Sequence, residues 1–103
     1  MTKRVQSPYV ATKLALKAAM VELGCPEFDA DKHVWRGGED PGGWSDTGAL
    51  ACIIHEGCGV PNEYNCKDPF AWWIDLADEV KAHCGKEVHF EDYNSCVTML
   101  YLD

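Results

Sequence analysis

The stretch DPFAWWIDLADEVKAHCG, residues 68–85, decides how the rest of the chain is arranged. Asp68 suits an N-cap because its carboxylate accepts from the free amides of a first helical turn, and Pro69 needs no amide donor at the first helical position. Gly85 enters the left-handed conformation at little cost, which commonly ends a helix. These signals predict a helix over residues 69–84.

The two sides of this helix differ in character. Apolar residues at three- and four-residue spacing predict the side that faces the core, namely Phe70, Trp73, Ala77, Val80 and Cys84, with Ile74 beside them. The opposite side carries Asp75, Asp78 and Glu79. Between the two sides runs a mixed strip formed by Trp72, Leu76, Glu79 and His83.

Two interpretations of the acidic side are open. Like charges three or four residues apart destabilise a helix by roughly 0.2–0.5 kcal/mol per pair, and only Lys81 is near enough in sequence to offset them. A solvated face with a loop over Trp72 explains the pattern as an ordinary amphipathic helix. A contact surface explains it as an aromatic anchor ringed by carboxylates.

An N-terminal helix is predicted over residues 8–23. Ser7 and Pro8 repeat the cap-plus-proline start, strong helix formers follow, and Gly24 ends the run. Lys13 and Lys17 share its polar side.

The middle of the chain is rich in glycine and proline. The segment RGGEDPGGW predicts a flexible loop over residues 36–44, preceded by a brief extended piece at His33–Arg36. Its glycines match no phosphate-binding loop. Ser45 or Asp46 is then suited to cap a helix over residues 46–56.

After Gly85 the apolar pattern changes to a period of two. Val88 and Phe90 alternate with polar residues, and CVTMLYL is rich in strand formers, which predicts a β-hairpin over residues 87–102. A lone hairpin is marginal in water, so we expect it to pack on helices or to gain His33–Arg36 as a third strand. The expected fold is a single α+β domain, residues 1–103, with about three helices.

Composition limits the classes of function. The chain has 103 residues, a mass of 11.5 kDa and a net charge of −8. Residues 1–21 carry four basic residues and no acidic one, while the remainder has five basic residues against 17 acidic ones. Such a body repels nucleic acid and anionic lipid and favours a basic protein partner.

The location of the protein is predicted from its N-terminus and its cysteines. MTKRVQSPYV lacks the apolar run of a signal peptide, and no stretch is long and apolar enough for a membrane span. We therefore expect a cytoplasmic protein whose six cysteines are reduced thiols.

A zinc site is one alternative chemistry, with no cofactor as the leading expectation. Cys52, His55, Cys58 and Cys66 have the spacing C-x2-H-x2-C-x7-C, and zinc binds four such ligands. The paired C-x2-C and H-x3-H knuckles of familiar zinc sites are missing. If a helix carries Cys52 and His55, those two side chains share one face.

Two catalytic alternatives rank lower. Cys52 with His89 would be a thiol nucleophile and its base, although Cys52 falls in the middle of a predicted helix, where the helix dipole does not lower its pKa. Asp75 with Asp78 or Glu79 would be a carboxylate pair for acid–base work, but exposed carboxylates are poor acids. The sequence therefore favours a binding protein over an enzyme.

In size and acidity the chain resembles phage-borne inhibitors of host defence, such as anti-CRISPR proteins, and bacterial toxin-immunity proteins. The resemblance implies a small inhibitor that presents carboxylates to a basic cleft that otherwise holds nucleic acid. The expected partner-binding residues are Trp72, Asp75, Asp78, Glu79, Glu87, Glu91 and Asp92. A homodimer, in which the N-terminal lysines of one copy meet this surface of another, is also open.

Overall fold

A computed structural model describes residues 5–55, 60–61, 67–94 and 97–103, with the side chains of Tyr93 and Asn94 left out. Its helices are α1 (Pro8–Glu22), α2 (Ala30–His33) and α3 (Pro69–Cys84). Its strands are β1 (Val34–Trp35), β2 (Ala51–Ile54), β3 (Val88–Asn94) and β4 (Val97–Leu102).

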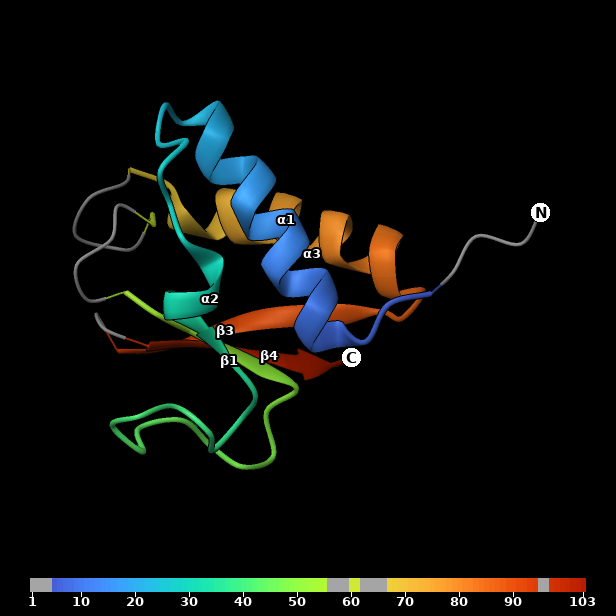
Figure 1. Cartoon of the computed structure of the whole chain (residues 1–103). Helices are drawn as coiled ribbons and strands as arrows, with labels where there is room; N and C mark the ends of the chain where they lie inside the picture. Colours follow the sequence, from blue (N-terminus) through green and yellow to red (C-terminus); the bar gives the residue numbers. More distant parts are fainter. Residues whose placement is uncertain (1–4, 56–59, 62–66, 95–96) are drawn as a thin grey trace.

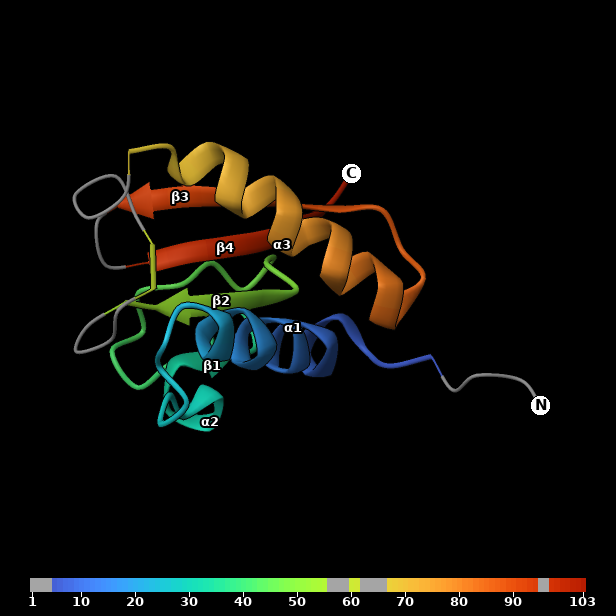
Figure 2. The same ribbon diagram turned by 90° about the horizontal axis from the view of Figure 1, so that it is seen from above.

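The described elements form an α+β fold around one antiparallel sheet of order β1-β2-β4-β3. Helices α1 and α3 cross each other over one face of this sheet (Figure 1), and the view from above shows both helices lying over the strands (Figure 2). The segment between β1 and β2 covers part of the other face, where Ala49 packs with Cys52 and Met99. The main core lies between the helices and the sheet.

Helices α1 and α3 begin where their capping residues predict, α3 also ends where predicted, and α1 ends at Glu22, one residue before its predicted end. Asp68 Oδ1 accepts a hydrogen bond from the Ala71 amide at 3.0 Å, and Gly85 ends α3 in the left-handed conformation with φ of 71°. Ser7 Oγ accepts from the Val10 amide at 3.2 Å at the start of α1. Local capping chemistry therefore sets both boundaries.

The buried side of α3 differs from the predicted one. Phe70 and Ile74 are 73% and 48% exposed, whereas Leu76 is buried. The cause is the position of α3, which packs against β3 on one side and against α1 on the Leu76 side. The buried arc is consequently turned away from Ile74 and toward Leu76.

The predicted helix over residues 46–56 is wrong, because β2 takes its place at the centre of the sheet. Strand β2 pairs with β4 in the register Cys52↔Met99 and with β1 in the register Trp35↔Cys52. A strand buried on both faces is a continuous apolar run, which periodicity alone does not distinguish from a buried helix. Asp46 instead closes a turn, since its Oδ1 accepts from the Gly48 amide at 3.0 Å.

The C-terminal hairpin is confirmed as β3 and β4, and the sheet is larger than predicted. The short strand predicted at His33–Arg36 exists as β1, but it reaches the hairpin through β2 instead of pairing with it directly. The third helix is α2, one turn long, which lies ahead of β1. Residues 36–44 form turns without helix or strand, and their flexibility stays a prediction.

Candidate functional site

A groove of about 450 Å³ lies between α1 and α3 on the side away from the sheet. It exists because small side chains on α1 leave the space between the two helices unfilled. The apolar part of its lining is Ala15, Ala18 and Ala19 of α1 with Leu76 of α3. Four carboxylates complete it, and they belong to Glu22, Asp75, Asp78 and Glu79.

The mixed strip predicted on α3 lies in this groove, since Trp72, Leu76, Glu79 and His83 all line it. Trp72 is half-buried, and its ring meets that of Trp73 edge to face, with centroids 4.9 Å apart and planes at 79°. Trp73 itself is buried in the core. Of two adjacent tryptophans, one therefore anchors the fold while the other offers part of its surface to the groove.

The charge in the groove has little compensation nearby. No lysine or arginine is among the lining residues, all of which belong to fully described helices. Lys81 of α3 pairs with Glu87, and Lys13 of α1 pairs with Asp31. Of the two lysines of α1, Lys17 therefore remains for the predicted contact with a second copy.

Glu22 is the groove residue that sequence reasoning missed. It ends α1, and its carboxylate lines the same groove as those of α3. Along the sequence Glu22 lies 50 residues before Trp72, so no local spacing connects them. The only available signal was its place as the first acidic residue after a basic N-terminal segment.

Three predicted partner-binding residues lie outside the groove. Glu87 pairs with Lys81, and Glu91 Oε2 lies 3.1 Å from His89 Nε2 on the sheet face away from the helices. Asp92 Oδ1 accepts from the Thr98 hydroxyl at 2.6 Å. The single acidic surface expected from the sequence is thus divided, because alternate residues of β3 point to opposite faces of the sheet.

A polar network links His55, just past the end of β2, to β4 and β3 at one end of the sheet. The Thr98 hydroxyl donates to Asp92 and so is free to accept from Nε2–H of His55, 2.6 Å away. His55 is buried beside Trp73, with ring centroids 5.8 Å apart. Burial lowers the pKa of His55 and His33 lowers it further, against the opposing effects of Asp92 and a hydrogen bond with the Val60 backbone.

The burial of His55 in this polar network predicts a loss of stability in mild acid. Unfolded His55 takes up a proton near pH 6.5, whereas the folded form resists it, so its contribution is complete above pH 6.5 and is lost as the pH falls through the folded pKa. We expect His55→Gln to make the fall in unfolding free energy below pH 6.5 less steep, by at most about 1.4 kcal/mol per pH unit, the slope that corresponds to one proton. Urea titrations at each pH measure this slope.

His89 supplies the control for that experiment. Its ring nitrogens lie 2.6 Å from Asp103 Oδ1 and 3.1 Å from Glu91 Oε2, and these hydrogen bonds raise its pKa. Its contribution is therefore complete below pH 6.5 and is lost as the pH rises through the folded pKa. His89→Gln should alter the slope above pH 6.5 only; an unchanged acid slope in His55→Gln would contradict the assignment.

The zinc alternative loses its geometric basis. Cys52 and His55 lie on β2 and just past its end, not on a helix, and they face opposite sides of the sheet. Cys52 packs with Met99 on the outer face, while His55 contacts Trp73 of α3. Cys58 and Cys66 lie outside the described residues. In the described ranges, no three His, Cys, Asp or Glu side chains are grouped as a metal site requires.

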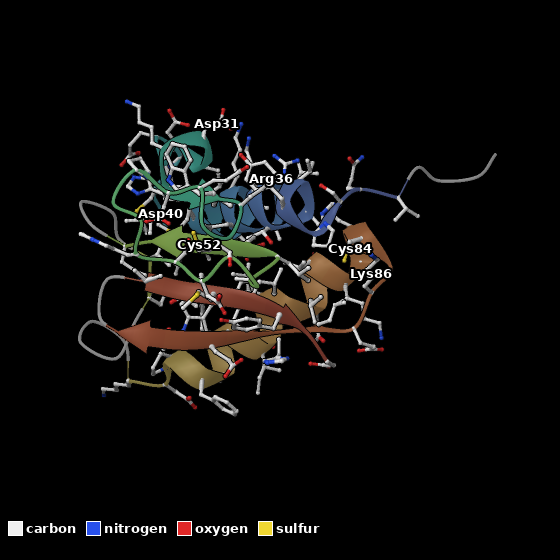
Figure 3. All side chains as sticks on the ribbon, turned by 90° about the horizontal axis from the view of Figure 1, so that it is seen from below. Asp31, Arg36, Asp40, Cys52, Cys84 and Lys86 are labelled. Carbon is white, nitrogen blue, oxygen red and sulfur yellow. The ribbon has the colours of Figure 1, made fainter. Side chains whose placement is uncertain are left out.

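The cysteine-nucleophile alternative also fails on geometry. Strand β4 separates β2 from β3, so the strands that carry Cys52 and His89 lie about 10 Å apart, and His89 is displaced further along β3. Burial raises the pKa of Cys52 and the charge of Asp40 raises it further, although hydrogen bonds from Ser45 and the backbone of Trp35 oppose this. Figure 3 shows Cys52 on β2 with Asp40 beside it in the adjoining segment.

Comparisons with protein-family models, curated proteins and solved structures find no match to this chain. Neither α1 nor α3, the longest helices in the described ranges, has the length and apolar character to cross a membrane. The groove is therefore interpreted from its own geometry and charge.

Proposed function

We propose that this chain is a small acidic inhibitor, of the anti-CRISPR-like phage anti-defence kind, that binds a basic protein partner through the groove between α1 and α3. The supporting observation is that four of the predicted partner-binding residues, Trp72, Asp75, Asp78 and Glu79, line one hollow together with Glu22. An acidic hollow with an aromatic wall suits the long basic side chains of a partner.

Arginine is the partner side chain that this groove suits best. A guanidinium group stacks on an aromatic face and binds carboxylates through paired hydrogen bonds. Trp72 supplies the aromatic surface, and the carboxylates of Asp75 and Glu79 lie one helical turn apart on the same wall. Protein surfaces that bind nucleic acid are rich in arginine. Arginine side chains of such a surface that are bound in this groove are no longer available to the nucleic acid.

A defined peptide tests the proposal. A fluorescently labelled arginine-rich peptide is titrated with the protein, beside a copy in which neutral citrulline replaces each arginine. We expect the arginine peptide to bind and the citrulline peptide not to bind, because the two differ in charge at nearly equal shape. Binding should weaken as salt rises from about 50 to about 200 mM, because the Debye length falls below about 10 Å and the charges of the groove and the peptide are screened. Equal affinity for both peptides, or none for either, contradicts the proposal.

Competition tests the inhibitory part. An RNA oligonucleotide bound to the same arginine peptide should be displaced by the protein, while the protein alone should leave the free oligonucleotide unbound. Displacement without any protein–RNA complex supports an inhibitor that masks a basic surface. Direct RNA binding contradicts it, since a body of charge −8 should repel the phosphates.

A further inference from the structure

A second hollow, of about 430 Å³, lies on the other side of the molecule, where α2, β1 and the segment 40–44 meet. Most of its wall is aromatic or apolar, supplied by Trp35, Pro41, Trp44 and Ile54. One acidic side chain, Asp40, belongs to the same wall. The acidic groove shares none of these residues.

Asp40 is a buried carboxylate without a cationic partner. It is 5% exposed and accepts from the amides of Trp44 at 2.8 Å and Ser45 at 3.1 Å and from the Ser45 hydroxyl at 2.5 Å. Burial raises the pKa of Asp40, but these hydrogen bonds outweigh it and lower the pKa overall. Among the described side chains, no lysine, arginine or histidine forms an ion pair with it.

Trp44 is held in place at the wall of this hollow. Its backbone is fixed by Asp40, and its indole lies against Gly42, where an added Cβ would come 2.9 Å from Cε2 and 3.1 Å from Nε1. The side chain of Trp44 is nevertheless 49% exposed. Asp40 and Gly42 thus present an indole ring on a surface segment, in the same hollow that the half-buried Trp35 of β1 lines.

We propose that this hollow binds an alkylated ammonium group, such as a trimethylammonium. Indole rings attract a cation without needing a hydrogen bond from it. A primary ammonium has three N–H donors, whereas Asp40 already uses three of its roughly four acceptor positions. A quaternary ammonium has no N–H to satisfy and supplies the positive charge that Asp40 lacks.

Two basic residues, Lys32 and His33, also line the hollow, and the charge of the lysine opposes a cationic ligand. Lys32 is exposed and lines the hollow at the end of α2, so its positive charge repels a bound cation. Its long side chain is free to turn toward solvent, which limits the repulsion. Removal of this charge should therefore increase affinity, an effect opposite in sign to the loss of an indole ring.

Choline and its neutral tert-butyl analogue, in which a carbon atom replaces the nitrogen, test the proposal. The two ligands have the same shape, so charge alone separates them. In NMR titrations of the labelled full chain we expect choline to bind about tenfold more tightly and to shift the indole N–H signals of Trp35 and Trp44. Equal affinity overturns the cation site, and the absence of binding by both ligands overturns the site altogether.

Three single substitutions complete the experiment. Trp44→Ala should weaken choline binding about tenfold, and Lys32→Gln should strengthen it about twofold. Phe70→Ala should leave choline binding unchanged, because the exposed side chain of Phe70 lines neither hollow. If Trp44→Ala and Lys32→Gln both leave affinity unchanged, the assignment is wrong. The outcome is independent of the arginine-peptide result, which depends on the other face.

Discussion

Replacement of Asp75, Asp78 and Glu79 together by lysine is expected to weaken binding of the arginine-rich peptide by about a hundredfold. Each reversal removes an attraction worth up to about 1 kcal/mol at an exposed site and adds a repulsion, and 1.4 kcal/mol corresponds to a factor of ten. All three side chains are exposed and line the groove. Fluorescence anisotropy at low salt measures the change in affinity.

The fold should survive this triple substitution. Like charges at the same helical spacing are exchanged for like charges of the opposite sign, so the repulsion among these three positions is nearly unchanged, and the added repulsion between position 78 and the exposed Lys81 is a few tenths of a kcal/mol, roughly 0.2–0.5. The buried side of α3 is not altered. Circular dichroism and urea unfolding of the variant should therefore match those of the unaltered protein, which separates a lost contact from a lost fold.

A matched control separates the groove from net charge. Glu27, Glu39 and Glu91 are exposed and lie outside the groove, so their joint replacement by lysine changes the total charge equally. We expect this control to weaken binding severalfold at most, through long-range attraction alone. Equal losses in the two triple variants would show that overall acidity, not the groove, attracts the peptide.

Trp73→Ala is expected to lower the free energy of unfolding by about 3–5 kcal/mol, the usual cost of truncating a large buried aromatic residue. Trp73 is 5% exposed, and its ring centroid lies 5.1 Å from that of Phe90 and 5.8 Å from that of His55. Such a loss is a large part of the stability of a small domain. Urea unfolding followed by circular dichroism measures it.

Trp72→Ala should have the opposite profile. Its side chain is half-buried at the groove, so we expect a stability loss of about 1 kcal/mol. Binding of the arginine peptide should fall about thirtyfold, as for an aromatic anchor at an interface. If Trp72→Ala destabilises the protein as much as Trp73→Ala, or leaves peptide affinity unchanged, the division of roles between the two tryptophans is wrong.

The parts of the fold that were predictable are those with local signals. Each of the two long helices is delimited by capping residues that act within a few residues of the helix end. These are Asp68 and Gly85 for α3, and Ser7 and Gly24 for α1. The hairpin was predictable from alternation and turn residues. Strand β2 was not, because a central strand that is apolar on both faces has no alternation to reveal it.

The candidate site was predictable only where one helix carries it. The spacing on α3 places Trp72 beside Glu79, and the structure keeps them together. Glu22 lies with them because α1 and α3 together form the groove. Glu91 does not, because it contacts His89 on the sheet face away from the helices. Asp40 was missed because a segment rich in glycine and proline gives no hint that one carboxylate is buried within it.

NMR mapping of the arginine-peptide complex tests the central assignment most directly. The proposal predicts that the largest shifts fall on the indole N–H of Trp72 and on the backbone amides of Ala18, Glu22 and Glu79, on both walls of the groove. The indole signals of Trp35 and Trp44 should stay in place, since they belong to the other face. Shifts concentrated on that face, or on Glu91 and its neighbours in β3, would contradict the assignment of function to the groove between α1 and α3.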